Sequence, residues 1–288
     1  MIQSLRQIKT RIRSVESTKK ITRAMQMVST AKFKRSESML NAGRPYYRKL
    51  DSILIKLLSS LRPEQLEGHP LLTERSEKKN LALCMITSDS GLCSVYNNNI
   101  INITEKLLKQ RGKDKVKIVA VGKKGFVYFS KRGANIVKSY LGLHGRYSPE
   151  IADTIAQDLI SMFLNGEADE IYIAHSHFET ATRYKPDIRK FLSITPPHPE
   201  MSEQEFIADP NINDILKDLI PRYLSVKMRM ILLDAFTTEH SSRMIAMQAA
   251  TDNAVELIDS LTLMRNKARQ ASITNQVIEV ATSAEALK

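Results

Sequence analysis

The chain has 288 residues, of which 42 % are hydrophobic and 26 % charged, so it can bury the core of one or two domains. Its formal net charge of +12 favours an acidic partner, and its two cysteines, Cys84 and Cys93, are too few and wrongly spaced for a disulfide framework or a CxxC pair. The sequence has no run of 18 apolar residues, so it predicts no membrane span. It has no apolar segment after the first charges, so it predicts no secretory signal.

Residues 1–41 contain neither glycine nor proline and therefore favour a continuous helix. Apolar side chains recur along them at steps of three and four, at Leu5, Ile8, Ile12 and Val15, and the apolar face continues after a local shift at Ile21, Met25 and Val28. Residues 1–49 hold thirteen Lys or Arg against two acids, so nearly all of the excess charge lies here. We assign residues 1–60 to a basic N-terminal helix of a coiled coil. Glycine and proline predict a linker over residues 43–77, at Gly43, Pro45, Pro63 and Pro70.

Residues 78–200 alternate between apolar runs typical of strands and amphipathic runs typical of helices. Strands are predicted at residues 80–87, 116–121, 134–139, 170–175 and 188–195. Helices are predicted at residues 96–109, from Gly122 to Ser130, and from a Ser148 cap with Pro149 at the first position to Leu164. This alternation predicts a small, mostly parallel, Rossmann-like α/β domain. An irregular connection is expected over residues 195–210.

The last 67 residues, 222–288, again lack glycine and proline. One row of side chains steps alternately by three and four, at Met244, Met247, Thr251, Ala254, Ile258, Leu261, Arg265 and Ala268. A second row repeats every seven residues, at Ala250, Leu257, Met264, Ala271 and Ile278. Together they predict a wide coiled-coil seam on a helix about 100 Å long, within a C-terminal segment 210–288. The fold class is therefore α/β, with a long antiparallel coiled coil of the N- and C-terminal helices and an inserted α/β domain.

Few residues suggest chemistry. A GxxxxGK[ST] phosphate loop is absent from the sequence, and Gly122-Lys123-Lys124-Gly125 is better explained as a strand-to-helix turn than as a phosphate site. His175 and His177 could offer two metal ligands, but the sequence suggests no third, so histidines at a strand end are the favoured interpretation. Residues 88–91 are typical of a turn. We expect no catalytic residues, no bound cofactor and no metal.

Distinctive motifs lie at both ends and in the middle of the chain, at residues 8–15 (IKTRIRSV), 18–28 (TKKITRAMQMV), 87–93 (TSDSGLC) with Tyr96 and Asn97, 243–247 (RMIAM), 249–254 (AATDNA) and 266–274 (NKARQASIT). On these motifs the chain resembles the γ subunit of F-type ATP synthases from end to end. The sequence departs from the family pattern at four positions. The family commonly has glycines at the positions of Ser94 and Val95, a basic residue at the position of Ser90 and an aromatic residue at the position of Arg265.

The resemblance implies a central rotor shaft that couples ion flow through a membrane c-ring to ATP synthesis or hydrolysis on catalytic β subunits. Implied partners are three α and three β subunits, the ε subunit and the c-ring, with MgATP and ADP bound by the α and β subunits. Matching positions imply contacts to β subunits at Arg269, Gln270, Thr274, Lys19, Lys20, Arg23 and Met25. Arg222 and Tyr223, where the last helix is expected to begin, are implied contacts to the c-ring foot. The implied location is peripheral, on the cytoplasmic face of a bacterial inner membrane.

Two other functions compete. A nucleic-acid-binding protein could use the basic helix, although binders of single strands interleave aromatic residues with their basic ones, and this stretch has only Phe33, Tyr46 and Tyr47. A small-molecule enzyme could use the α/β domain, but it lacks catalytic residues.

Overall fold

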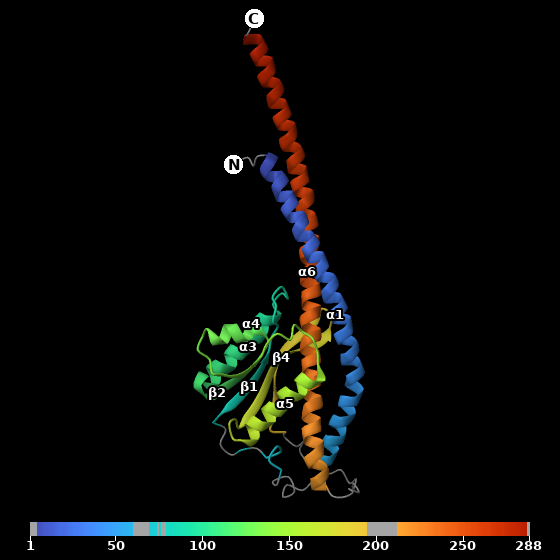
Figure 1. Cartoon of the computed structure of the whole chain (residues 1–288), viewed down its shortest axis with the longest axis vertical. Helices are drawn as coiled ribbons and strands as arrows, with labels where there is room; N and C mark the ends of the chain where they lie inside the picture. Colours follow the sequence, from blue (N-terminus) through green and yellow to red (C-terminus); the bar gives the residue numbers. More distant parts are fainter. Residues whose placement is uncertain (1–4, 60–68, 74, 76–78, 195–211, 287–288) are drawn as a thin grey trace. The chain divides into compact units, whose positions relative to one another are not determined.

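The computed structural model describes residues 5–59, 69–73, 75, 79–194 and 212–286. They divide into two compact units, one of residues 5–29 and 244–286 and the other of the described residues between 30 and 243. The long helices α1 (Leu5–Ser59) and α6 (Ile212–Ala286) contribute to both units. This grouping differs from the expected segments 1–60, 78–200 and 210–288, because parts of both helices pack into the core of the α/β unit (Figure 1).

The expected linker from residue 43 is wrong over its first part, since α1 continues through Gly43 and Pro45 to Ser59. Proline inside a helix removes one hydrogen bond and costs about 3 kcal/mol. The following turns compensate for this loss by burying a row of apolar side chains in the core, namely Leu50, Leu54, Leu57 and Leu58. The remaining expected breakers fall at Pro63, outside the described residues, and at Pro70, in a turn.

Helix α6 likewise begins earlier than predicted, at Ile212, and contains Pro221. Residues on both sides of this proline are buried in the same core, Leu216 and Ile220 before it and Leu224 after it. Tertiary packing therefore overrides the local helix-breaking signal at both prolines. The irregular connection expected over residues 195–210 lies outside the described residues.

The α/β unit contains a five-stranded sheet in the order β3-β2-β1-β4-β5. The strands are β1 (Leu81–Ile86), β2 (Val116–Val121), β3 (Ile136–Tyr140), β4 (Glu170–Thr180) and β5 (Arg183–Leu192). The first four are parallel and β5 is antiparallel to β4, which confirms the mostly parallel sheet. Strands β4 and β5 extend beyond the predicted 170–175 and 188–195, since they form a hairpin whose outer half has polar, half-exposed residues.

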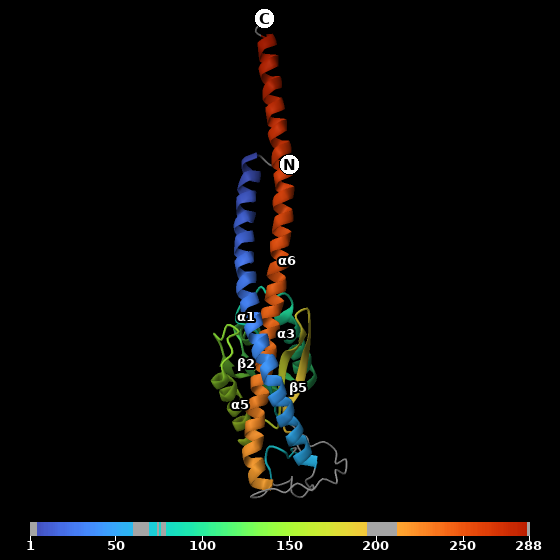
Figure 2. The same ribbon diagram turned by 90° about the vertical axis from the view of Figure 1, so that its right-hand side faces the viewer.

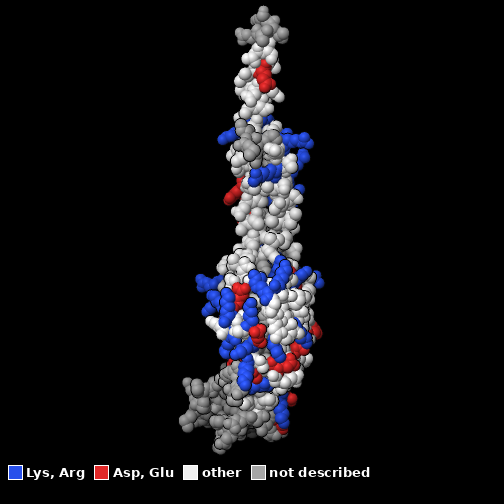
Figure 3. Space-filling model, turned by 90° about the vertical axis from the view of Figure 1, so that its left-hand side faces the viewer, with Lys and Arg blue, Asp and Glu red and all other residues white. Residues whose placement is uncertain are grey.

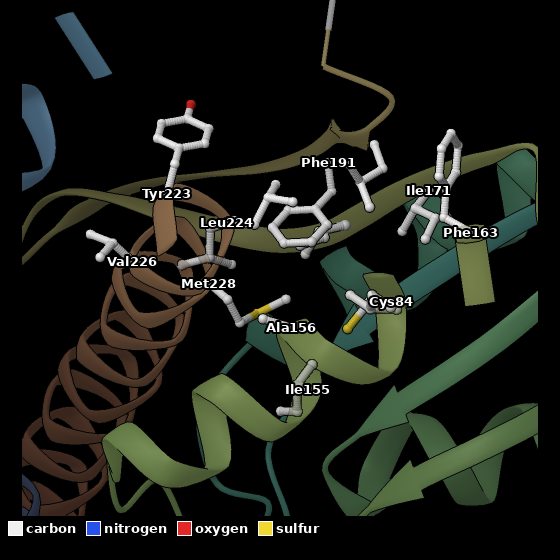
Figure 4. Packing of buried hydrophobic residues seen from close by; sticks show 14 of the residues in the cluster. Cys84, Ile155, Ala156, Phe163, Ile171, Phe191, Tyr223, Leu224, Val226 and Met228 are labelled. Carbon is white, nitrogen blue, oxygen red and sulfur yellow. The ribbon is translucent and has the colours of Figure 1, made fainter. Parts of the chain in front are cut away.

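Helices cover the two faces of the sheet. Alternate residues of the strands separate the two cores: Cys84 and Ile173 belong to one, and Leu83 and Ile118 to the other. The first core is closed by α5 (Pro149–Leu164) together with α1 and α6, and Figure 4 shows α5 and α6 side chains meeting in it. The second is closed by α3 (Tyr96–Arg111) and α4 (Lys123–Ser130). Among the described residues no helix is long and apolar enough to cross a membrane.

Candidate functional site

The coiled-coil unit pairs the first part of α1 with the last part of α6 in antiparallel directions. Ile8 and Ile12 pack with Leu261, and farther along α1 Thr22 accepts a hydrogen bond of 2.9 Å from the hydroxyl of Thr251. Residue numbers rise on one helix as they fall on the other, and the two helices lie side by side in Figures 1 and 2. The predicted antiparallel coiled coil is confirmed.

The seam of this coiled coil changes from apolar to polar along its length. Beyond the apolar cluster, Thr22 and Thr251 form one hydrogen-bonded layer, and the amide of Gln26 bonds that of Gln248 in the next. The predicted continuation of the apolar face is wrong at Ile21 and Val28, which are 58 % and 57 % exposed. A step of four from Val15 to Lys19, followed by a step of three to Thr22, keeps the seam in phase and turns those two side chains outward.

The second row predicted for the seam on α6 is also exposed in its outer part. Leu257 is 40 % exposed, Met264 51 % and Ile278 54 %. The buried row is the one through Met247, Thr251, Ala254 and Leu261, because a two-helix seam covers only a narrow stripe of each helix. The outer part of α6 therefore presents apolar side chains that no described residue of this chain covers.

The residues implied as β-subunit contacts fall into two groups of this unit. Lys20 and Arg23 are exposed on α1, with Lys19 and Met25 half-buried beside them. Arg269, Gln270 and Thr274 are exposed on α6, where the Thr274 hydroxyl donates to the Gln270 carbonyl at 3.0 Å. The antiparallel register places Thr251 opposite Thr22, so the centres of the two groups lie about 30 Å apart along the coil at 1.5 Å per residue. On the face shown in Figure 3, Lys and Arg gather in one band of this unit beside a nearly uncharged stretch.

The α/β unit buries a polar stretch of α6, residues 234–243, against the loops that follow the parallel strands. Arg243 is at its centre: its guanidinium donates to the Glu239 carboxylate at 2.8 Å, to the Ser90 carbonyl at 3.0 Å and to the Gly91 carbonyl at 3.2 Å. Burial raises the pKa of Glu239, although Arg243 opposes this shift. The turn predicted at residues 88–91 is thus a docking point for α6.

Further bonds tie the same stretch of α6 to its surroundings. The Ser242 hydroxyl donates to the Cys93 carbonyl at 2.8 Å, and the Tyr96 hydroxyl donates to the Ala235 carbonyl at 3.2 Å. His240 Nε2 lies 2.9 Å from the Gly145 carbonyl. Since a buried polar helix face is stable only when its groups are bonded, these contacts hold the helix to the sheet in one orientation.

The loop between β2 and α4 is a structural turn rather than an anion site. Gly122 has φ 90°, and a Cβ there would lie 2.0 Å from the Thr87 carbonyl oxygen. The Thr87 hydroxyl accepts the Gly125 amide at 3.0 Å, and the Asp89 carboxylate accepts the Lys123 amide at 2.9 Å. The amides that would hold a phosphate already have partners within the chain.

The two residues implied at the c-ring foot differ in their exposure to solvent. Arg222 is exposed, whereas Tyr223 is buried and donates a hydrogen bond of 2.7 Å to the Asp51 carboxylate of α1. Burial and the neighbouring Tyr47 raise the pKa of Tyr223. The last helix was expected to begin at these two residues, directly after Pro221. That expectation is wrong, because α6 starts at Ile212.

The histidines of β4 gain a neighbour that the sequence does not suggest. His175 and His177 point to one side of the sheet, and Asp234 of α6 joins them. His177 Nδ1 lies 2.6 Å from Asp234 Oδ2. Asp234 is 57 residues away from His177, so only the packing of α6 on the sheet brings the three together.

Comparisons with known proteins agree over nearly the whole chain. The family model described as ATP synthase matches residues 4–287. The chain is 40 % identical to the ATP synthase gamma chain of Moorella thermoacetica over 99 % of both chains, and 38 % identical to that of Halothermothrix orenii over 100 % of both.

Solved structures share the fold. A chain from the Euglena gracilis mitochondrial ATP synthase (OSCP/F1/c-ring, rotational state 3) has a TM-score of 0.68 and 14 % identity, with 98 % of this chain and 94 % of that chain covered. A chain from the Tetrahymena thermophila mitochondrial ATP synthase (central stalk/c-ring) has a TM-score of 0.63 and 23 % identity, with 80 % and 99 % covered. From the family match and the full-length identity, the chain belongs to the ATP synthase gamma-chain family.

Proposed function

We propose that this chain is the central rotor shaft of an F-type ATP synthase, coupling ion flow through a membrane c-ring to ATP synthesis or hydrolysis on the β subunits. The observation that carries the proposal is the outer part of α6. From residue 269 to residue 283 every side chain is exposed, including Ile273, Val277, Ile278 and Val280, each at least 52 % exposed. Apolar surface of this extent on a continuous helix calls for a surrounding partner.

The partner proposed for the outer part of α6 is the ring of three α and three β subunits. The exposed apolar side chains of this helix would make contacts that depend little on its rotational angle, as a bearing requires. Arg269, Gln270 and Thr274 are the proposed polar contacts to a loop of a β subunit, and they lie on the exposed surface of this helix.

The basic surface of α1 is proposed to face acidic segments of the β subunits. Lys20 and Arg23 are exposed, and Lys19 and Met25 are half-buried. Charges on long, mobile side chains attract without locking one pose. An asymmetric shaft therefore meets each β subunit differently at any moment, and its rotation changes the three catalytic sites in turn.

The α/β unit is proposed to hold the ε subunit and to stand on the c-ring. Arg222 remains a proposed foot contact because it is exposed. Tyr223 is now better explained as an internal brace between α6 and α1, since it is buried and bonds Asp51. The chain would have no catalytic site and bind no nucleotide of its own, with MgATP and ADP held by the α and β subunits. It would be peripheral to the membrane, on the cytoplasmic face.

Co-purification tests the proposal. The exposed turn Lys113–Lys115 is the place for an affinity tag, because insertion there disturbs neither the sheet nor the coiled coil. Gentle solubilisation of membranes should recover three α and three β chains per tagged chain, with magnesium-dependent ATPase activity. Recovery of the tagged chain with nucleic acid and without these subunits would contradict it and support the nucleic-acid alternative.

A further inference from the structure

The α/β unit contains a cavity of about 360 Å³ between α1, the β4–β5 hairpin and α6. His175, His177 and Asp234 all line it. Each offers one metal-ligating atom, and the three atoms lie within 4.8 Å of one another. Two imidazoles and a carboxylate are a common set of protein ligands for zinc.

His175 brings a buried ring nitrogen without a partner to this cluster. It is 1 % exposed, and its Nδ1 has no hydrogen-bond partner among the described residues. A buried polar atom without a partner is rare and costs about 1–3 kcal/mol.

The three ligand atoms lie within 4.8 Å of one another, so all three groups have to adjust their positions to hold one ion. His177 Nδ1 and Asp234 Oδ2 are 2.6 Å apart. A tetrahedral ion with bonds of about 2.0–2.1 Å separates its ligand atoms by roughly 3.3 Å. The pair therefore has to open by about 0.7 Å, starting from the 2.6 Å hydrogen bond. The His177 side chain is 34 % exposed, which gives it room to move.

The charged side chains around the cavity determine which further ligand a bound cation would have. Arg44 lies 3.6 Å from Asp234 Oδ1 and holds that oxygen as an outer partner. Arg48, Arg189, Lys190 and Lys227 also line the cavity, and burial lowers the pKa of Lys227 to about 8. These cations oppose a bare dication but favour an anion as its fourth ligand. The all-oxygen environments that Mg²⁺ and Ca²⁺ require are absent from this ligand set.

We propose that His175, His177 and Asp234 form a site for a borderline-soft divalent cation of the zinc class, with water or a small anion as fourth ligand. The site joins β4 to α6. A bound ion would fasten the long helix to the sheet, so its role is structural and no reaction is assigned to it.

Zinc binding by the full-length, untagged chain tests this proposal. Isothermal titration should show one Zn²⁺ per chain, and excess Zn²⁺ should raise the thermal midpoint by about 5 °C when its concentration is a hundred times Kd. His177→Asn and Asp234→Asn should each weaken binding by at least about tenfold. Co²⁺ in place of Zn²⁺ should give the visible absorption of a four-coordinate ion.

His144→Asn is the matched control, since it removes an exposed histidine outside the cavity at a position, φ 48°, that asparagine accepts. It should bind Zn²⁺ as the original chain does. His175→Asn should abolish binding, and if that buried change prevents folding, the His177 and Asp234 variants still decide. Absence of zinc binding, or binding unchanged in both of these variants, would overturn the proposal and leave His177 and Asp234 as a hydrogen-bonded pair.

Discussion

Replacing Arg243 by methionine should destabilise the α/β unit strongly, because it removes one half of a buried ion pair. The side chains of Arg243 and Glu239 are 10 % and 2 % exposed and lie 2.8 Å apart. Breaking such a pair on one side costs about 3–5 kcal/mol, since the remaining charge stays buried. We expect the free energy of unfolding of the full-length chain to fall by about 4 kcal/mol.

The size of this loss should depend on pH. Burial already raises the pKa of Glu239 above its ordinary 4.5, against the opposing effect of Arg243. An acid whose folded-state pKa is raised binds its proton more tightly when folded, so it favours folding at low pH and this contribution is lost as pH rises above 4.5. Without Arg243 the pKa rises further. The deficit of the Arg243→Met variant should therefore be larger at pH 8 than at pH 5.

Urea unfolding followed by circular dichroism and tyrosine fluorescence measures these quantities. Glu239→Gln in the Arg243→Met background should recover part of the loss, because no charge is then left buried. Arg146→Met, at an exposed arginine, should change stability by less than about 0.5 kcal/mol. A loss below about 1 kcal/mol for Arg243→Met, or a deficit independent of pH, would refute the reasoning.

Four other outcomes follow from single positions. Arg269→Glu should impair ATP-driven proton pumping by inverted vesicles; normal pumping would remove Arg269 from the β-subunit contacts. Gly122→Ala should cost more than about 3 kcal/mol, because φ is 90° and the added Cβ would lie 2.0 Å from the Thr87 carbonyl oxygen; a soluble variant of unchanged stability would contradict this. Ser94→Gly should stabilise the chain by about 1 kcal/mol, since Ser94 has φ 51°, and a lower melting temperature would speak against it. Burial lowers the pKa of His240 from 6.5 to about 4, so stability should be lost as pH falls from 6.5 toward 4, by up to about 3 kcal/mol. His240→Gln should flatten that dependence, and a profile as steep as before would assign it to other groups.

Most of the fold could be predicted from local patterns. The apolar runs of β1 and β2 and the Ser148–Pro149 start of α5 agree with the structure to within a residue or two, because each is determined by neighbouring residues. The helix boundaries predicted near Pro45 and Pro221 were wrong, because both prolines lie inside helices that distant residues stabilise. There the helix is maintained by leucines that pack into a core assembled from distant segments.

The functional surfaces, too, could be predicted only where neighbouring residues determine them. The steps of three and four residues from Met244 to Ala268 predict a row on α6 that faces the partner helix, and its members Met247, Thr251, Ala254 and Leu261 are buried. These steps cannot tell how wide a stripe the partner helix covers. Leu257 and Met264 fall just outside that stripe and are exposed. Asp234 could not be connected to His177 from the sequence, because their proximity depends on the rotation of α6 against the sheet.

The two polar layers of the coiled coil have a consequence for how rotation is transmitted along that unit. An apolar seam tolerates sliding by a whole heptad, about 10 Å, because each side chain finds an equivalent hole. A slip of this size in one direction would move Gln26 away from Gln248 and place it opposite Val255. Thr22 and Thr251 would lose each other as well. The hydrogen-bonded layers thus fix the position of each helix along the other. A twist applied to one helix is therefore passed to the other without sliding between them.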